Sequence, residues 1–133
     1  MVTDRVGDFI IRLQNAAKVG KREVIMPYSG HLLAIAKKLK ELGYIASVEV
    51  DAKDESVKQT IAVMLAYDEH GFSKVRGVKR VSKPGRRLYT SHTDAHRVKG
   101  GAGARILSSS VGIISDTEAR KNRHGGEELF EIW

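Results

Sequence analysis

The sequence of 133 residues contains no cysteine. This absence excludes disulfide bonds, thiolate metal ligands and a cysteine nucleophile, and it favours a cytoplasmic protein. Long apolar runs are also absent: the longest, Ile61 to Tyr67, is far shorter than the roughly 18 residues that a membrane-spanning helix needs. The first 20 residues include Asp4 and Asp8 and resemble neither a secretory signal nor a transit peptide. We therefore expect a soluble protein that makes no membrane contact.

The composition is typical of a globular protein, and the chain is basic. Hydrophobic residues make up 41% and charged residues 29% of the chain, which is close to the average for globular proteins. A chain of this length supplies one compact domain or two small halves, so a multidomain enzyme is excluded. The net charge is +7 and the pI is near 9.8. This balance points to a polyanionic partner, with nucleic acid as the leading candidate.

The first half of the chain predicts the element order α-β-α-β-β. The predicted elements are a helix over about 4–18, a strand over 23–26, a helix between Ser29 and Gly43, and strands over 44–51 and 57–67. Thr3 is placed to cap the first helix and Ser29 the second, while Pro27 ends the short strand. The last two strands are joined by a charged turn at 52–55, which indicates an antiparallel hairpin.

The second half predicts short strands with one or two short helices. The expected pieces are strands over 72–81, 86–90, 104–108, 112–115 and 127–133, with a short helix between Ser115 and Gly125-Gly126. Ser115 and Glu118 have the spacing of a capping box. Apolar patterning pauses at 68–71, so we expect an N-terminal α/β half over 1–67 and a mainly β C-terminal half over 68–133. The predicted fold class is α+β with two small subdomains.

Positive charge is concentrated between Lys74 and Arg105. Ten Lys and Arg residues lie there against the single acid Asp94. A solvated face explains most charge runs, but this one is nearly free of compensating acids, which favours phosphate contact. Tyr89 lies inside the cluster, where its ring can stack on an unpaired base, although an isolated tyrosine is more often half-buried in a core.

A hydroxyl-rich turn over Ser108–Gly112 separates two apolar strands. Short side chains allow a ligand to approach closely, and hydroxyl groups with exposed backbone amides can bind phosphates, ribose hydroxyls and base edges. The alternative is a turn whose serines satisfy local backbone groups, and spacing alone favours that alternative.

The rival from another class is a small hydrolase, because Ser109, Asp116 and His124 supply the residue types of a catalytic triad. The Gly-x-Ser-x-Gly nucleophile elbow is absent, and so short a chain lacks the large sheet that presents it. The five histidines show no metal-ligand spacing, and the glycines at 100, 101 and 103 lack the full nucleotide-binding pattern. We expect no enzymatic activity, metal, cofactor or small-molecule substrate.

Motifs along nearly the whole chain resemble the family of bacterial small-subunit ribosomal protein eight (the S-eight family). The matching segments are Asp4-x-x-x-Asp8-x-x-x-Arg12-x-x-Asn15-Ala16, Met26-Pro27-x-Ser29, 39–45 (LKELGYI), 80–89 (RVSKPGRRLY), 108–116 (SSSVGIISD), Ala119-Arg120 and Gly125-Gly126-Glu127. The motifs occur in the family's order, so the resemblance is specific.

The resemblance implies a structural component of the small ribosomal subunit, bound to the ribosome in the cytoplasm. Such a protein is a primary rRNA-binding protein that docks on a helix of the central domain of the small-subunit rRNA and supports assembly of the platform. Neighbouring small-subunit proteins are implied as partners, with ribosomal proteins five and twelve foremost. The resemblance also admits autogenous repression of translation. The alternative within nucleic-acid binding is a free-standing RNA-binding regulator.

The resemblance also implies which residues contact RNA. The implied set comprises Ser108, Ser109, Ser110 and Gly112 in the serine turn, Lys83, Arg86, Arg87 and Tyr89 alongside it, Glu127 as a residue that orders the site, and Arg12 and Asn15 as a second contact on the first helix. The chain departs from the family at Val111, where a lysine is usual. Arg105 can compensate for the lost charge, unless strand geometry points it elsewhere.

Overall fold

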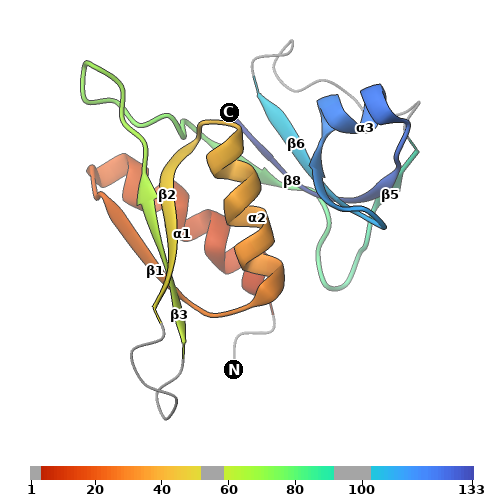
Figure 1. Cartoon of the computed structure of the whole chain (residues 1–133), viewed down its shortest axis with the longest axis horizontal. Helices are drawn as coiled ribbons and strands as arrows, with labels where there is room; N and C mark the ends of the chain where they lie inside the picture. Colours follow the sequence, from red (N-terminus) through yellow and green to blue (C-terminus); the bar gives the residue numbers. More distant parts are fainter. Residues whose placement is uncertain (1–3, 52–58, 92–102) are drawn as a thin grey trace. The chain divides into compact units, whose positions relative to one another are not determined.

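The structure, a computed structural model, describes residues 4–51, 59–91 and 103–133 (Figure 1). These residues form three helices and two antiparallel sheets, which confirms the α+β fold class. The chain divides into two compact units, one comprising Phe9–Arg76 and the other comprising Met1–Asp8 and Gly77–Trp133. The expected halves 1–67 and 68–133 stay a prediction.

Both helices of the first half begin beside a capping side chain, and the predicted cap of the second, Ser29, is confirmed. Helix α1 spans Arg5–Val19 and helix α2 spans Gly30–Glu41. Asp4 precedes α1, and its Oδ1 accepts a hydrogen bond of 3.1 Å from the Gly7 N–H, while Thr3 lies outside the described residues. Ser29 caps α2 by accepting from the Leu32 N–H at 3.5 Å. Gly43 follows α2 with a φ of +89°, which a glycine adopts without strain.

The first sheet comprises β1 (Glu23–Pro27), β2 (Ile45–Asp51) and β3 (Thr60–Leu65) in the order β1-β3-β2. Both pairings are antiparallel, which confirms the order α-β-α-β-β and the pairing of the last two strands; the turn at 52–55 lies outside the described residues. Helices α1 and α2 lie on one face of this sheet (Figure 1). The core between them consists of Phe9, Ile10, Leu13, Val24, Met26, Leu32, Ile35, Leu39, Ile45, Ile61, Val63 and Leu65.

The second sheet comprises β4 (Val78–Arg80), β5 (Tyr89–Thr90), β6 (Ala104–Ser109), β7 (Gly112–Ser115) and β8 (Gly126–Ile132). The strand order is β4-β8-β6-β7, and β5 also pairs with β8. Helix α3, Asp116–Asn122, lies against this sheet (Figure 1). Beneath the helix Leu107, Ile114 and Ala119 form a buried cluster. The central strand β8 therefore carries pairings from three other strands.

The strand expected over 72–81 is mostly wrong, because only Val78–Arg80 forms one. The preceding residues are held by a turn in which the Asp68 carboxylate accepts from the His70 and Phe72 N–H groups, each at 2.9 Å. The strand expected over 86–90 shortens to Tyr89–Thr90. Arg86 instead closes the Pro84-Gly85 turn with Lys83, through two backbone hydrogen bonds of 2.9 Å.

The predicted N-cap of α3 at Ser115 is confirmed, but the end of the helix is not where the sequence predicts it. The Ser115 Oγ accepts from the Glu118 N–H and donates to the Glu118 carboxylate, both at 3.3 Å. The helix ends at Arg123, whose φ of 58° is left-handed. Gly125 and Gly126 therefore do not terminate it; they are placed where strands approach too closely for a side chain, as described below.

Candidate nucleic-acid interface

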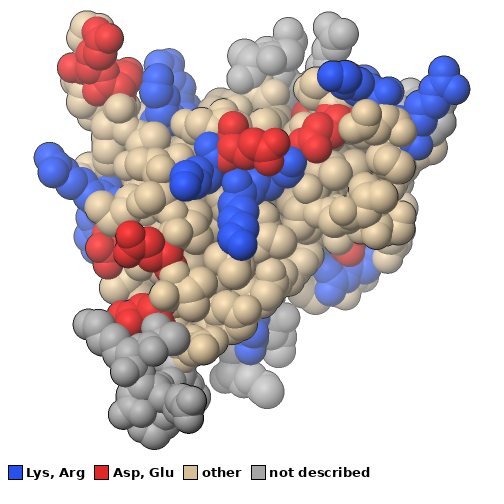
Figure 2. Space-filling model, viewed as in Figure 1, with Lys and Arg blue, Asp and Glu red and all other residues tan. Residues whose placement is uncertain are grey.

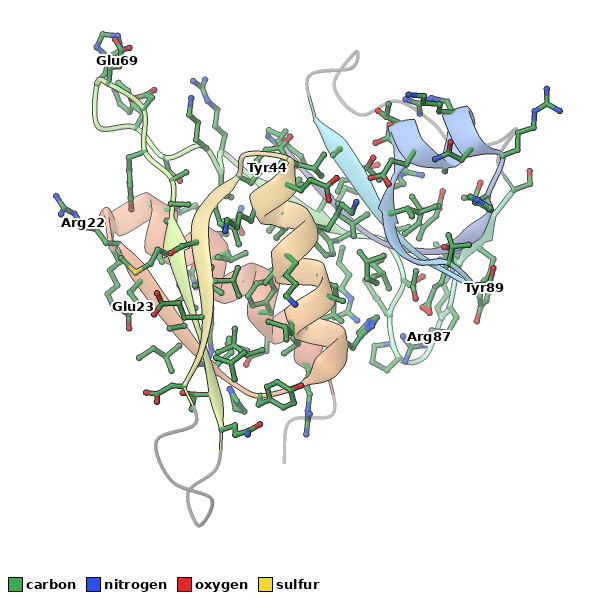
Figure 3. All side chains as sticks on the ribbon, in the orientation of Figure 1. Arg22, Glu23, Tyr44, Glu69, Arg87 and Tyr89 are labelled. Carbon is green, nitrogen blue, oxygen red and sulfur yellow. The ribbon has the colours of Figure 1, made fainter. Side chains whose placement is uncertain are left out.

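Three of the predicted site residues form a row across the second sheet. Glu127 on β8 lies opposite Ser108 on β6 and opposite Tyr89 on β5. Directly opposed residues of antiparallel strands present their side chains on the same face, so the three side chains share one face. Leu107 precedes Ser108 and packs beneath α3, which places this row on the face away from α3. Tyr89 is 72% exposed and is labelled in Figure 3.

Arg87 joins this row by an ion pair with Glu127. The Arg87 guanidinium lies 3.5 Å from Glu127 Oε2, and the Arg87 side chain remains half-exposed while that of Glu127 is 17% exposed. The Oε2 atom is buried and makes no hydrogen bond within the described residues. Arg87, labelled in Figure 3, thus pairs with a carboxylate of the sheet while part of its side chain stays in solvent.

Arg80, on β4, is a further cation of this unit, and it is mostly buried. Its Nε donates to the Ser82 carbonyl at 2.6 Å, and its guanidinium pairs with Asp4. Burial and then the positive charge of Arg87 lower the pKa of Arg80, while Glu127 opposes that change. Arg80, Arg87 and Glu127 therefore lie within electrostatic reach of one another, and Asp4 supplies the anion that compensates Arg80.

The serine turn is a two-residue hairpin loop between β6 and β7. Ser109 lies opposite Gly112, so Ser110 and Val111 form the apex, and both are exposed. The Ser109 Oγ accepts from the Val111 N–H at 3.2 Å and donates to the Gly112 carbonyl at 2.9 Å. The φ of +119° at Gly112 favours glycine. Ser109 thus stabilises the backbone, as the structural interpretation of the turn predicts. RNA contact by Ser108 and Ser110 stays a prediction.

Gly125 and Gly126 let the chain pass close to its neighbours beside this row. A Cβ on Gly126 would collide with the carbonyl oxygen of Ser108, and one on Gly125 would lie 2.6 Å from the Thr90 carbonyl oxygen. Only residues without a Cβ permit this approach. The glycine pair therefore fixes how closely β8 lies to Ser108 on one side and to β5 on the other.

The Pro84-Gly85 turn carries the other two predicted cations of this unit. Lys83 and Arg86 flank the turn, pair with each other through their backbones, and are both exposed. Since the turn fixes their backbone, their side chains extend from a defined place into solvent. Lys83, Arg86 and Arg87 are thus available to an external anion.

Arg105 does not compensate for the missing lysine at Val111. Its guanidinium pairs with Glu128 at 2.8 Å and with Glu131, and its side chain is 16% exposed. Burial alone would lower the pKa of Arg105, but hydrogen bonds to Glu131 and Glu128 outweigh it and raise the pKa. Arg105 is three residues before Ser108, so the alternation of a strand points it to the opposite face.

Other basic residues are also engaged with acids. Arg120 donates to Asp116 at 2.8 Å, and the second oxygen of that buried carboxylate accepts from the Arg105 N–H at 3.0 Å. On the face drawn in Figure 2, blue Lys and Arg atoms are interspersed with red Asp and Glu atoms. The net charge of the chain therefore does not show how many Lys and Arg side chains lack an acidic partner.

The predicted second contact lies in the other unit. Arg12 and Asn15 are exposed on α1, and Arg12 donates to the Ile25 carbonyl at 3.2 Å. Both residues line an open groove of about 450 Å³ between α1 and β1, together with Lys21 and Glu23.

Two of the three residues of the hydrolase alternative, Asp116 and Ser109, are engaged in other contacts. The Asp116 carboxylate faces Arg105 and Arg120, and the Ser109 hydroxyl belongs to the hairpin loop. His92 and His96 lie outside the described residues. Among the residues that are described, no group of acids and histidines could hold a metal ion, and no helix is long and apolar enough to cross a membrane.

Sequence reasoning missed three residues of this region: Asp4, Arg80 and Gly126. The composition places Arg80 among the free cations, because it does not show that the β4 residue is mostly buried beside Asp4. The sequence predicts that Gly126 ends a helix, whereas it opens strand β8. The position of Gly126 directly before Glu127 is the sequence signal for its role, since a glycine in a strand often marks a place where another backbone approaches closely.

Comparison with known proteins matches the entire length of the chain. The family described as "Ribosomal protein S8" matches residues 4–133. The chain is 41% identical over 133 residues to "Small ribosomal subunit protein uS8" of Helicobacter pylori, and 40% identical to that of Helicobacter acinonychis, with 100% of each chain covered. It is 39% identical over 132 residues to the protein of the same name from Syntrophus aciditrophicus, covering 99% of this chain and 98% of the relative.

Proposed function

The chain belongs to the ribosomal protein S8 family, and from this membership we propose that it binds small-subunit rRNA through its second sheet. As a member of that family the chain is a structural component of the small ribosomal subunit and not an enzyme. The observation that carries the proposal is the row Tyr89, Glu127 and Ser108, with Arg87 against Glu127 and the exposed hydroxyl of Ser110 beyond.

We propose that this surface recognises the shape of an irregular RNA helix. Lys83, Arg86 and Arg87 contact phosphates and position the RNA. The serine turn enters the wide, shallow minor groove, where Ser108 and Ser110 bind 2′-hydroxyl groups and base edges, and Gly112 allows close approach. Ser109 keeps the loop in shape, and Glu127 orders Arg87 beside it. No covalent chemistry follows; binding fixes a local RNA geometry.

Tyr89 contributes a different kind of contact. Its ring is largely exposed beside Glu127, so it can stack on an unpaired base or pack on a ribose. Arg12 and Asn15, on α1 of the other unit, provide a second RNA contact in this proposal. Two contacts on one chain strengthen binding more than either alone.

The finer assignments follow from the family resemblance. We propose that the chain is a primary binder that docks on a helix of the central domain, supports assembly of the platform, and stays ribosome-bound in the cytoplasm beside ribosomal proteins five and twelve. The same surface would serve autogenous repression if the messenger presents a mimic of the rRNA site. A free-standing regulator would remain in the supernatant when ribosomal subunits are sedimented, whereas the proposed protein sediments with them.

A filter-binding experiment tests the serine readout. Ser110→Ala removes one hydrogen-bonding group, so we expect about fivefold weaker binding to the cognate rRNA helix and little change on a random duplex. Ser47→Ala, a hydroxyl deletion on the first sheet, is the matched control and leaves both affinities unchanged. Equal weakening on both RNAs would contradict the serine readout.

The phosphate contacts are tested by salt dependence. Arg86→Ala removes one phosphate contact, so the slope of log affinity against log salt should fall by roughly 0.7 to 0.9. Lys37→Ala removes an exposed cation from α2 and should leave the slope unchanged. An unchanged slope for Arg86→Ala would remove Arg86 from the phosphate contacts.

A further inference from the structure

A buried hydroxyl closes the base of the loop that carries the proposed phosphate contacts. Residues 83–87, which we call the basic loop, connect Ser82 to Leu88 and contain three cations and no acid. All five loop residues are exposed, whereas Ser82 beside them is 1% exposed. A polar side chain so deeply buried needs hydrogen-bond partners within the protein. Those partners show what Ser82 does.

The Ser82 side chain bonds both backbone groups of Leu88. Its Oγ accepts from the Leu88 N–H at 2.9 Å and donates to the Leu88 carbonyl at 3.1 Å. A hydroxyl can make both bonds at once, because it has one donor hydrogen and two acceptor lone pairs. The Ser82 hydroxyl therefore joins the two ends of the basic loop directly. An alanine of similar size could make neither bond.

Both ends of the loop are also bonded to one position of β8. The Ser82 N–H donates to the Glu128 carbonyl at 3.0 Å, and the Glu128 N–H donates to the Leu88 carbonyl at 2.9 Å. The Nε of Arg80 donates to the Ser82 carbonyl at 2.6 Å, so every polar group of Ser82 is hydrogen-bonded. The base of the basic loop is thus fixed against Glu128, the residue that follows Glu127 of the row.

The place of Leu88 determines where two proposed RNA contacts begin. Arg87 precedes it and pairs with Glu127 at 3.5 Å, and Tyr89 follows it and lies opposite Glu127; Figure 3 labels both. Surface loops with exposed backbones are otherwise free to adopt many conformations. A loop that is ordered before binding loses less conformational entropy when its cations meet phosphates, so it binds more tightly.

We propose that Ser82 is a positioning residue for RNA binding. It is too deeply buried to touch RNA, and it acts through the basic loop, whose three cations it holds in the conformation that meets phosphates. This inference rests on the proposed function, because it assigns those cations to phosphate binding. The alternative is that Ser82 contributes to the stability of the second sheet and to nothing else.

A double-mutant cycle separates the two roles. Lys83→Ala with Arg86→Ala removes two cations of the basic loop, and we expect about tenfold weaker filter binding to the cognate rRNA helix. Ser82→Ala alone should weaken binding by about fivefold, because the loop is then ordered only on binding. With Ser82→Ala already present, removing both cations should weaken binding by roughly threefold or less. A full tenfold loss in that background would overturn the proposal.

Ser115→Ala is the matched control. Ser115 lies in the same unit and is 2% exposed, and its hydroxyl also makes two hydrogen bonds, but both are to Glu118 of α3. Each variant is titrated to its active concentration, so that unfolded protein does not count as lost affinity. Ser115→Ala should bind like the parent and keep the full effect of removing the two cations. If Ser115→Ala reduces that effect as Ser82→Ala does, lost stability explains both, and the proposal fails.

Failure of the proposed function has a different result. If Lys83→Ala with Arg86→Ala binds as tightly as the parent, the basic loop does not contact phosphates, and the present inference falls with that contact. A measurement on the parent protein covers the case in which Ser82→Ala does not fold. The Leu88 N–H should exchange with solvent at least about a hundredfold more slowly than in an unfolded chain, because its acceptor is a buried hydroxyl. Rapid exchange at Leu88 would show that Ser82 does not hold the loop and would overturn the proposal.

Discussion

The two sheets of the molecule are stabilised by different means. The first packs an apolar layer from every strand against α1 and α2, and its acids all face outward. The second also has an apolar core, but charges are built into its pairings: Arg105 on β6 reaches Glu128 and Glu131 on β8, and Arg87 reaches Glu127. The alternation of apolar and polar residues along the strands sets the register of the first sheet. The second sheet depends in addition on ion pairs between its strands.

This difference changes how the basic cluster is interpreted. Arg80 and Arg105 belong to the cluster by sequence, yet both are mostly buried and paired with acids from other parts of their own unit. Lys83 and Arg86 are exposed at a turn and carry their charge outward. The exposed positive charge of this cluster is therefore smaller than the composition indicates, because two of its arginines are buried against acids.

Deleting buried volume in the first sheet should cause the largest loss of stability. Ile61→Ala removes a side chain that is 1% exposed between sheet and helices, so we expect the free energy of unfolding to fall by about 3–4 kcal/mol in urea denaturation. Ile25→Ala on the outward face of the neighbouring strand is the control and should cost well under about 1 kcal/mol. Similar losses for the two variants would show that the inward layer is not what stabilises this sheet.

Breaking the charge network should cost the second sheet nearly as much. Arg105→Met leaves Glu128 and Glu131, 11% and 15% exposed, without their cation, and we expect a loss of about 3 kcal/mol. Adding Glu128→Gln and Glu131→Gln should recover much of that loss, because the unpaired charges are then gone. Lys79→Met, an exposed cation opposite Glu131, is the matched control. A loss below about 1 kcal/mol for Arg105→Met would remove the contrast between the sheets.

Much of the first unit could be predicted from sequence because local signals agree with one another there. Ser29 caps α2, Pro27 ends β1 and a glycine follows α2, and each position works by a mechanism contained within a few residues. The apolar periods of the helices and strands then indicate which faces are buried. The expected elements and the observed ones coincide within a few residues.

The second unit was predicted less well because its order depends on distant pairings. Nothing near Val78 indicates that β4 is short, since its partner is the C-terminal strand β8. The row that joins Tyr89, Glu127 and Ser108 arises from three separate segments. Its members were named through family resemblance, and their alignment became visible only through the strand register.

The two helix caps offer a smaller test of the same contrast. Ser115 is 2% exposed, and its hydroxyl accepts from the Glu118 N–H and donates to the Glu118 carboxylate, so Ser115→Ala should cost about 1.5 kcal/mol. Ser29 is partly exposed and accepts one long hydrogen bond, so Ser29→Ala should cost about 0.5 kcal/mol. Serine-to-threonine variants at both sites keep the hydroxyl and should retain most of the stability. Equal costs measured in urea would mean that the burial of Ser115 and its second hydrogen bond add nothing to the stability of α3.

The smallest effect concerns Asp68, whose charge acts locally in the first unit. Hydrogen bonds from the Phe72 N–H, and secondarily from His70, hold the pKa of Asp68 below its ordinary value of 3.8. A lowered folded-state pKa stabilises the folded state above the unfolded value, and that contribution is lost as the pH falls through the folded value. Asp68→Asn keeps an acceptor oxygen but does not titrate, so it should be slightly less stable than the parent at neutral pH and equal to it in acid. If the difference in stability between Asp68→Asn and the parent persists unchanged in acid, the turn depends on the shape of the side chain and not on its charge. Stabilisation by charge would then be limited to the second sheet.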